Sequence, residues 1–318
     1  MITDDQLDVV QTCWTTVLGT AARRGPALSG RQLWPVTADD GRAYFLKRLG
    51  PWRNLPVADE ARILRWLANH GIDVADFMIT DSASIFAGAP EDSFVLIPRL
   101  DSDDLEPSEV IAAERSVGQT IAELHGVLSC YPWSANSYVE RLGTALTGEL
   151  VLPSDVEAAY APLRDRLVDA VDRLPTQLVH GDLTPDNVLL RRPGEVSGFI
   201  DFDHLPIAPR VWDVCRYLSR RMRARWQCEQ TRIDRLGCVK PFLDGYRNVV
   251  ALTAAELAVM PELIMAANII EVSYSQKVAS GLLDRRMLPD HLEVLADTTE
   301  TVRWQLAHLD ELRHAVVS

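Results

Sequence analysis

The sequence predicts an α+β fold, with an antiparallel sheet and a helix at the N-terminal end and mostly helices after them. Short apolar runs at 31–36 and 44–49 flank a cluster of turn residues, which is typical of a β-hairpin. After residue 106 the apolar residues recur mainly at helical spacing. The polar segment Asp101–Asp104 separates the two patterns. We therefore expect an N-terminal domain over residues 1–100 and a C-terminal domain over 101–318.

Periodicity and turn residues predict the N-terminal elements in order. An apolar stripe over 4–20 predicts an amphipathic helix that ends near Gly19. The hairpin follows, and a second amphipathic helix is expected over 58–67, closed a few residues later by a glycine. Two or three further short strands are expected between Val74 and Leu100, of which the last is Phe94–Leu100.

The C-terminal elements are mainly helices, with one hairpin among them. Helices are expected over 107–128, 155–173, 211–218, 255–281 and 290–315. The hairpin is predicted because the apolar runs Val188–Leu190 and Phe199–Ile200 flank an Arg-Pro-Gly turn. The polar loop Asp182–Asn187 enters its first strand, and Asp201 ends its second. Three polar side chains should therefore meet at one end of this hairpin.

Composition and charge limit the classes of function. The net charge of −13 at pH 7 disfavours nucleic acid, whose phosphates require a basic surface, and is compatible with a cationic small molecule. No apolar run approaches the roughly 18 residues that span a bilayer, and Met1–Asp5 does not resemble an export signal, so we expect a cytoplasmic protein outside the membrane. The five scattered cysteines form no Cys-x-x-Cys pair, and neither a disulfide framework nor a zinc site is expected. The sequence sets no oligomeric state.

The three polar residues of the hairpin suit metal-assisted phosphoryl transfer. A carboxylate such as Asp182 can orient a hydroxyl and accept its proton. An amide oxygen and a second carboxylate, here Asn187 and Asp201, are hard ligands suited to Mg²⁺ on nucleotide phosphates. The alternative is an ordinary polar hairpin loop, because Thr184–Asn187 is also good turn sequence. The ordered set within so short a stretch favours the catalytic interpretation.

The motif His-Gly-Asp-Leu-Thr-Pro-Asp-Asn, followed by Ile-Asp-Phe-Asp, resembles the aminoglycoside phosphotransferase and choline kinase family, the small-molecule branch of the protein-kinase-like fold. The resemblance implies a two-lobed fold with a nucleotide-binding N-terminal lobe and a C-terminal lobe for catalysis and acceptor binding. It also implies ATP, with GTP as an alternative, and Mg²⁺. Asp182 would be the base, and Asn187 and Asp201 the metal ligands.

Lys47 is a candidate for binding the nucleotide phosphates. It is one of three lysines among 32 basic residues, which suggests that a compact ammonium group is needed at this position. Such a lysine requires an acidic partner, and we expect Glu60, on the helix over 58–67, to be that partner. The alternative is a surface lysine and a surface glutamate that do not touch.

The resemblance also implies where the adenine edge is bound. With Ile97 as gatekeeper, the contacts come from the carbonyl of Pro98 and the N–H of Leu100. Proline retains a carbonyl although it lacks an N–H, so the sequence is compatible with this assignment.

Several further residues are given structural interpretations. We expect His125 and His180 to be structural, and Asp213 to brace the catalytic loop or cap its helix. The basic run Arg216, Arg220, Arg221, Arg223 and Arg225 is interpreted as a solvated face, with binding of a nucleotide phosphate or a partner as the alternative. Four acids, each interpreted as a surface residue, could instead receive a cationic acceptor: Glu262, Glu271, Asp284 and Asp290.

The predicted function is an ATP- and Mg²⁺-dependent O-phosphotransferase that acts on a hydroxyl of a small molecule. The acidic net charge favours an aminoglycoside or another hydroxylated antibiotic as acceptor, and a primary metabolite such as an amino alcohol, homoserine or a sugar is the alternative. A catalytically inactive binding module is a further alternative. A protein kinase is disfavoured because Gly181 stands where Arg is usual and the chain between Asp201 and Asp213 is too short for an activation loop.

Overall fold

The computed structural model describes residues 3–28, 32–50, 53, 55–89, 92–132, 146, 148–223, 234–283 and 288–318. The chain divides into two compact units. Unit 1 comprises Met1–Ser102 together with Ser197–His204, and unit 2 comprises Asp103–Val196 and Leu205–Ser318.

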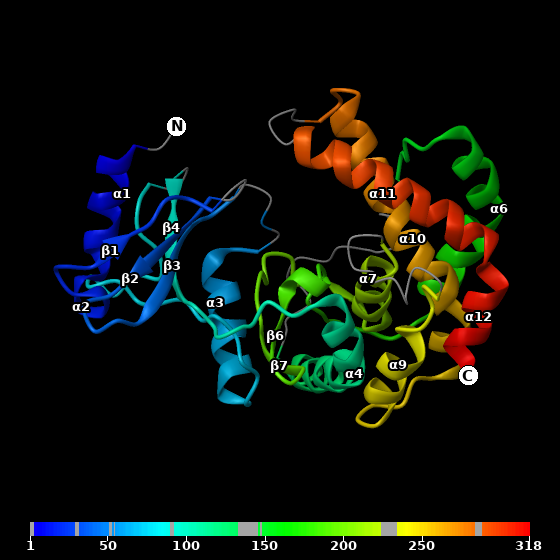
Figure 1. The fold of residues 1–318 in the computed structure, drawn as a ribbon, viewed down its shortest axis with the longest axis horizontal. Coiled ribbons are helices and arrows are strands. Elements are labelled where there is room, and N and C mark those ends of the chain that lie inside the picture. The colour runs from blue at the N-terminus through cyan, green and yellow to red at the C-terminus, as the bar shows by residue number, and fades with distance from the viewer. Residues whose placement is uncertain are drawn as a thin grey trace. The chain divides into compact units, whose positions relative to one another are not determined.

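Unit 1 is built on a four-stranded antiparallel sheet in the order β1-β2-β3-β4 (Figure 1). Its strands are β1 (Arg23–Arg24), β2 (Leu33–Thr37), β3 (Ala43–Arg48) and β4 (Phe94–Pro98). Its helices are α1 (Asp4–Gln11), the 3₁₀ turn η1 (Thr12–Trp14), α2 (Thr15–Leu18) and α3 (Val57–Asn69). The predicted hairpin is confirmed, because β2 pairs with β3 from Leu33 opposite Lys47 to Thr37 opposite Ala43.

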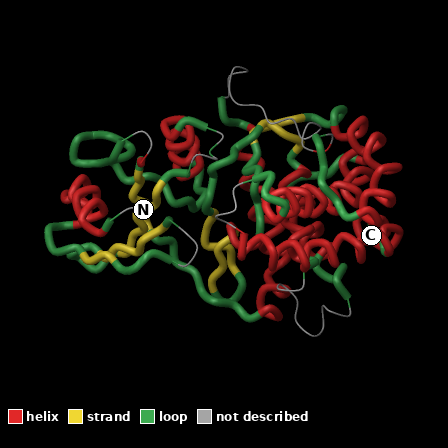
Figure 2. The backbone as a smooth tube through the Cα atoms, turned by 90° about the horizontal axis from the view of Figure 1, so that it is seen from above, coloured by secondary structure: helices red, strands yellow, loops and turns green. Residues whose placement is uncertain are grey.

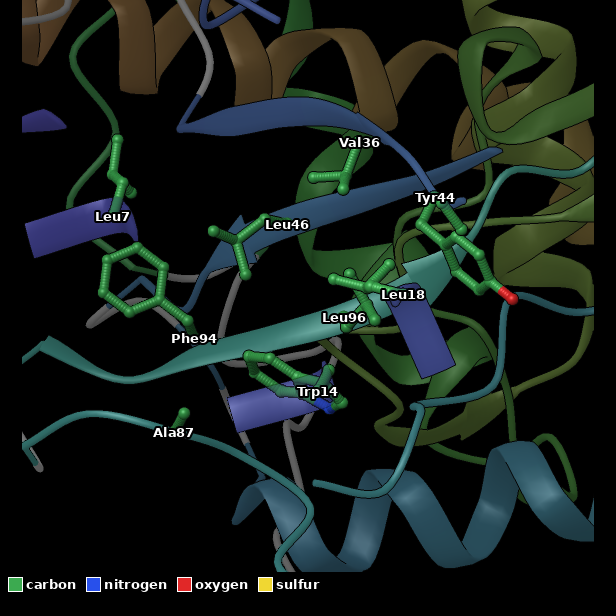
Figure 3. Close-up of a cluster of buried hydrophobic side chains, with 10 residues drawn as sticks. Leu7, Trp14, Leu18, Val36, Tyr44, Leu46, Ala87, Phe94 and Leu96 are labelled. Carbon is green, nitrogen blue, oxygen red and sulfur yellow. The ribbon is translucent and has the colours of Figure 1, made fainter. Parts of the chain in front are cut away.

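The N-terminal helices cover the core of this sheet. Helix α1 begins with a reciprocal capping box between Thr3 and Gln6. Helix α2 ends at Gly19, whose φ of 81° is a left-handed conformation that glycine adopts without strain. Between these two ends, apolar side chains of the helices pack against those of β2, β3 and β4 (Figure 3). The cluster contains Leu7, Trp14, Leu18, Val36, Tyr44, Leu46, Phe94 and Leu96. The predicted helix over 4–20 is therefore confirmed, with a 3₁₀ turn in its middle.

The prediction of two or three strands between Val74 and Leu100 was wrong in number. Among the described residues of this stretch, β4 is the one strand, and Val74, Met78 and Ala87 form isolated bridges. A tight turn over Thr80–Ser84 interrupts the extended chain. The Ser84 N–H donates to the hydroxyl of Thr80 at 2.9 Å, and the Thr80 N–H donates to the carbonyl of Ser84 at 2.8 Å. Apolar residues alone do not make a strand where the backbone turns this often.

Unit 2 is mostly helical (Figure 2). Its helices are α4 (Pro107–Ser129), α6 (Ser154–Val171), α7 (Val211–Arg221), α9 (Val239–Arg247), α10 (Ala254–Ala279), α11 (Leu288–Ala307) and α12 (Leu309–Val317). Short strands lie among them: β5 (Thr176–Leu178) pairs with β8 (Ile207–Pro209), and β6 (Val188–Arg191) pairs with β7 (Glu195–Phe199). The second pair is the predicted hairpin, and β7 belongs to unit 1 from Ser197 onward. The 3₁₀ turn η3 (Pro185–Asn187) leads into β6.

Helix α10 is the central helix of unit 2. It begins with a capping box between Thr253 and Glu256 and is buried on nearly every side, as expected for a helix whose apolar residues surround it. Helix α7 and helix α11 both pack against it. An ion pair between Glu114 and Arg221, both almost fully buried, joins α4 to α7. The predicted α+β fold, with an N-terminal antiparallel sheet and mostly helices after it, is confirmed.

Among the residues that the structure describes, no helix combines the length and the apolar character needed to cross a membrane.

Candidate functional site

The catalytic-loop candidate of unit 2 lies between β5 and η3. Its backbone turns at Gly181, where φ is 86° and a side chain would be strained. The carboxylate of Asp213, near the start of α7, accepts the backbone N–H of His180 at 2.8 Å and that of Gly181 at 2.9 Å. The carbonyl of Gly181 accepts the indole N–H of Trp212 at 3.1 Å. The first turn of α7 therefore fixes the backbone immediately before Asp182.

Asp213 is itself held by two buried side chains. Its Oδ2 lies 3.2 Å from Nε2 of His125, and Nδ1 of the same ring lies 2.8 Å from the hydroxyl of Tyr246. Asp213 and His125 are buried, so this chain of hydrogen bonds is shielded from water. The expected bracing role of Asp213 and the structural role of His125 agree with these contacts. His180 is also fully buried.

The side chain of Asp182 is oriented by Arg216 of α7. The guanidinium donates Nε–H to Oδ1 of Asp182 at 2.8 Å, and its Nη2 group contacts the same oxygen. Burial alone would lower the pKa of Arg216, but the negative charges of Asp182 and Glu271 outweigh burial and raise it. Asn187 is tied to the same loop, because its amide Nδ2 donates to the carbonyl of Asp182 at 2.8 Å. The structure thus brings Asp182 and Asn187 together in unit 2.

In unit 1, Lys47 of β3 lies against two aspartates. Its Nζ donates to Oδ1 of Asp201 at 2.5 Å and to Oδ1 of Asp203 at 3.2 Å. Burial lowers the pKa of Lys47, yet the charges of Asp201 and Asp203 overcome this effect and raise the pKa above its ordinary value. Lys47 is therefore a protonated ammonium at neutral pH. Asp201 has a φ of 69°, an uncommon value for a residue with a side chain.

The expected pairing of Lys47 with Glu60 is not present in the structure. Glu60 of α3 forms its ion pair with Arg53, whose Nη1 also donates to Oδ1 of Asp203 at 2.9 Å. Burial is the largest effect on Arg53 and lowers its pKa, against the opposing charge of Asp203. Arg53 thus occupies the carboxylate that we had assigned to Lys47, and Asp203 takes the place of Glu60 as the acid beside the lysine.

The backbone groups of Pro98 and Leu100 lie at the end of β4, the edge strand of the sheet. The N–H of Arg99 donates to the carbonyl of Ala43 at 3.0 Å, and the next opposite pair along the strands is Tyr44 and Pro98. Hydrogen-bonded and non-hydrogen-bonded pairs alternate along antiparallel strands, so the backbone N–H and carbonyl groups of this next pair point away from the partner strand. The carbonyl of Pro98 therefore faces the outer side of the strand. Within the described part of the chain, the N–H of Leu100 donates to no acceptor. Both groups have the freedom that the predicted adenine contacts require.

The basic run on α7 is not a solvated face. Arg221 and Arg223 are buried, and the side chains of Arg216 and Arg220 are only 14% and 12% exposed. Our expectation failed because the neighbouring helices and loops supply polar partners: Arg216 contacts Asp182, Arg220 contacts Glu271 and Arg221 contacts Glu114. Arg225 lies outside the described residues.

Sequence reasoning missed the roles of Arg53, Asp203 and Arg216. The sequence carried a signal for Asp203. It stands where the protein-kinase Asp-Phe-Gly motif ends in glycine, and an acid at that position suggests that it replaces another acid nearby. Arg216 stands three residues after Asp213 and therefore lies on the same face of α7. If Asp213 contacts the loop before Asp182, Arg216 is expected to face the same loop. Arg53 carries no comparable hint, because it lies in an irregular segment before α3.

Asn187 of unit 2 and Asp201 of unit 1 each carry a hard oxygen atom of the kind that binds magnesium. Among the described residues, no group of three or more His, Cys, Asp or Glu side chains could hold a metal alone. Asp201 already attracts a cation, because the ammonium group of Lys47 lies against it. Asn187 directs its amide N–H inward to the loop, and no donor of the described chain reaches its amide oxygen. Hard oxygen donors completed by phosphates are the ligand set that Mg²⁺ prefers.

Solved structures of small-molecule kinases share this fold. One is the amicoumacin kinase hAmiN in complex with AMP-PNP, Ca²⁺ and Ami, with a TM-score of 0.72, 18% identity, and coverage of 95% of this chain and 94% of that one. A second is a microcompartment-associated aminopropanol kinase, with a TM-score of 0.72, 15% identity, and coverage of 96% and 98%. The fold is therefore the two-lobed, protein-kinase-like fold of small-molecule phosphotransferases.

The chain belongs to the phosphotransferase enzyme family, whose model matches residues 27–248. Two curated relatives are named homoserine kinase. That of Beijerinckia indica subsp. indica is 37% identical over 91 residues, which are 28% of this chain and 26% of the relative. That of Neisseria meningitidis serogroup B is 34% identical over 112 residues, which are 35% of each chain. The matches span about a quarter to a third of these relatives.

Proposed function

We propose that the chain transfers the γ-phosphoryl group of Mg²⁺–ATP to a hydroxyl group of a small molecule. The observation that carries the proposal is the fixed position of Asp182. Asp213 holds the loop backbone before it, and Arg216 holds its carboxylate. Phosphoryl transfer depends mostly on positioning and on neutralising charge, which a carboxylate fixed on two sides can supply.

Asp182 is assigned to the acceptor hydroxyl. Its carboxylate accepts the hydroxyl's hydrogen bond, aims the oxygen at the phosphorus and takes the proton as the new bond forms. Arg216 favours the ionised form of this carboxylate and so makes it a weaker base. Orientation of the hydroxyl is therefore its larger contribution, with proton removal late in the transfer.

Lys47, Asn187 and Asp201 are assigned to the nucleotide. Asn187 and Asp201 would hold Mg²⁺, which when bound neutralises charge on the phosphates. Lys47 exchanges its aspartate contacts for phosphate oxygens, and Asp203, tethered by Arg53, keeps the ammonium aligned. The carbonyl of Pro98 and the N–H of Leu100 receive the edge of adenine. Glu60 acts indirectly, by holding Arg53.

The names of the relatives divide between the two acceptor classes considered from the sequence. The amicoumacin kinase and an aminoglycoside phosphotransferase from Alicyclobacillus acidocaldarius support a hydroxylated antibiotic, and the latter structure has a TM-score of 0.63 and 15% identity. The homoserine kinases and the aminopropanol kinase support a primary metabolite. We propose a primary metabolite, because the acids offered for a cationic antibiotic are already paired: Glu271 with Arg220, and Glu262 with Arg313. Asp284 and the side chain of Asp290 lie outside the described residues.

A nucleotide-consumption assay tests the proposal. The purified protein, with Mg²⁺ and ATP, is offered amino alcohols, hydroxy amino acids, sugars and aminoglycosides, and the phosphorylated product is identified by mass spectrometry. Asp182→Asn should lower the turnover number by about 10²–10⁴ while nucleotide affinity is retained. Asp186→Asn makes the same change at an exposed aspartate of the same loop, so it is the matched control and should keep full turnover. Product formation by Asp182→Asn at the native rate would refute the assignment of the base.

A further inference from the structure

Arg216, which contacts Asp182, belongs to a cluster of three arginines that the proposed transfer reaction does not use in full. Arg216 and Arg220 stand one turn apart on α7, and Arg223 follows its last turn. Two polar residues of α10, Asn268 and Glu271, face them. We call these five residues the arginine cluster. All five belong to unit 2, as does Asp182.

The three guanidinium groups have unequal partners. Arg216 is bound to Asp182, and Arg220 donates to Oε2 of Glu271 at 2.8 Å. Arg223 donates through Nε and Nη2 to a neutral acceptor, Oδ1 of Asn268, at 3.0 and 2.8 Å. Among the described residues, no carboxylate forms an ion pair with Arg223. Its third nitrogen, Nη1, also has no partner in this part of the chain.

Asn268 cannot turn to offer Arg223 anything else. Its amide nitrogen donates to the carbonyl of Ser219 at 3.1 Å and to Oε1 of Gln305 at 3.2 Å. These bonds fix the carbonyl oxygen toward Arg223 and hold the guanidinium in one place. The guanidinium of Arg223 is therefore buried, with the residue only 2% exposed, and is held in position by contacts that involve three helices.

Arg223 differs from the other two arginines in its partners. Arg216 and Arg220 form ion pairs with Asp182 and Glu271, whereas among the described residues the charges of Glu271 and Asp297 act on Arg223 without an ion pair. The charges of Arg220, Arg216 and Arg223 outweigh burial and lower the pKa of Glu271, so this acid is ionised at neutral pH. Burial, and then the nearby charge of Arg220, lower the pKa of Arg223 to about 9, which still leaves it protonated at pH 7. A buried guanidinium whose hydrogen bonds go to a neutral amide oxygen is costly, and a bound anion lowers that cost.

We propose that the arginine cluster binds a carboxylate of the acceptor while Asp182 receives the acceptor's hydroxyl. This inference rests on the proposed function and names its substrate class: compact hydroxy acids and hydroxy amino acids. The planar fork of arginine suits a carboxylate. Arg216 touches Asp182, and Arg220 lies about 6 Å further along the helix axis, so a short carbon chain would span both groups. A polycationic aminoglycoside would meet the same positive charges unfavourably.

Binding to the nucleotide-free protein tests the inference without requiring turnover. Calorimetric titrations would compare L-homoserine, L-serine, D-glycerate and 4-hydroxybutyrate, each with its primary amide, which keeps the hydroxyl and removes the charge. Inorganic phosphate and an aminoglycoside, kanamycin, complete the set. At least one acid should bind about tenfold more tightly than its amide, as expected for charged hydrogen bonds.

Two substitutions should change the binding of that acid in opposite directions. Arg223→Gln should weaken the binding of the hydroxy acid by about tenfold and leave the binding of its amide unchanged. Glu271→Gln removes a negative charge and should strengthen the binding of the hydroxy acid, an effect that a misfolded protein cannot produce. Arg303→Gln, at an exposed arginine of α11 paired with Asp155, is the control and should change nothing. Arg223→Lys preserves the charge and should retain part of the preference.

The outcomes separate this inference from the proposed function. Equal binding of every acid and its amide, or weaker acid binding in Glu271→Gln, would overturn the carboxylate subsite even if ATP is consumed. Binding of inorganic phosphate that depends on Arg223, with no preference for any acid, would likewise overturn it, since the cluster would then serve the phosphoryl group. Selective acid binding without product formation under Mg²⁺–ATP would instead uphold the subsite and remove the proposed function.

Discussion

Arg53 links two buried acids of unit 1, Glu60 and Asp203. It lies between Glu60 and Asp203, and the side chains of Arg53 and Glu60 are 8% and 3% exposed. Removing one member of such a pair leaves the other charge buried and uncompensated, which is far more costly than removing both. The position of Asp203, and through it the position of Lys47, should therefore depend on Arg53.

We expect Arg53→Met to lower the free energy of unfolding by about 3–5 kcal/mol, because Glu60 loses its partner. The double variant Arg53→Met with Glu60→Leu should recover most of this loss. Urea unfolding followed by circular dichroism measures both, and Arg48→Met, at a half-buried ion pair with Asp92, is the control. Additive losses in the double variant would show that the two charges do not depend on each other.

At the scale of elements, α7 joins the loop before Asp182 to the arginine cluster. Its first turn carries Asp213, which holds the backbone of that loop, and its later turns carry Arg216 and Arg220 of the cluster. Both ends depend on neighbouring helices: His125 of α4 holds Asp213, and Glu271 of α10 holds Arg220. The helix is thus fixed along its length by buried polar contacts, which are satisfied only in one arrangement of these helices.

The ion pair between α7 and α10 should make stability depend on acid pH. The pKa of Glu271 lies below its ordinary value of 4.5, so its ionised form stabilises the fold fully above that value. This contribution is lost as the pH falls through the lowered folded pKa, when Glu271 becomes protonated. The midpoint of thermal unfolding, measured from pH 7 to pH 3, should fall more steeply for the native chain than for Glu271→Gln. Parallel curves would exclude this group as a source of acid sensitivity.

The sequence predicted the elements well and their side-chain pairings poorly. Periodicity located the helix over 107–128 and the hairpin around Asp182–Asp201, because local spacing determines which face of an element is apolar. The partner of Lys47 depends on which acid the folded chain brings nearest, and local spacing carries no information on that. The partners of the α7 arginines were missed for the same reason, since Glu114 and Glu271 are distant in sequence.

At the scale of the whole molecule, the predicted nucleotide site should be visible in thermal stability. A ligand present at 100 times its Kd stabilises the folded state by about 2.7 kcal/mol, and each kcal/mol raises the unfolding midpoint by about 2–4 °C in a chain of this size class. Mg²⁺ with ATP should therefore raise the midpoint by several degrees, and EDTA should remove most of this shift. In Asp201→Asn, the unfolding midpoint should rise with Mg²⁺ and ATP only as little as it does for the native chain in EDTA. In Asp186→Asn, the midpoint should rise as it does in the native chain. A full shift in EDTA would exclude the assigned metal ligands.

The contact between Lys47 and Asp201 has a thermodynamic consequence for the order in which ligands arrive. Under the proposed assignment, a metal ion that comes alone would have to displace the ammonium group of Lys47 from Asp201. A nucleotide that comes alone would bring its phosphates close to Asp201 and Asp203 without a cation to separate the charges. When both come together, Lys47 would pair with the phosphates and Asp201 would hold the metal. Because linkage is reciprocal, each ligand would then raise the affinity of the other by the same factor. The salt bridge would thereby favour recognition of the metal–nucleotide complex over either component.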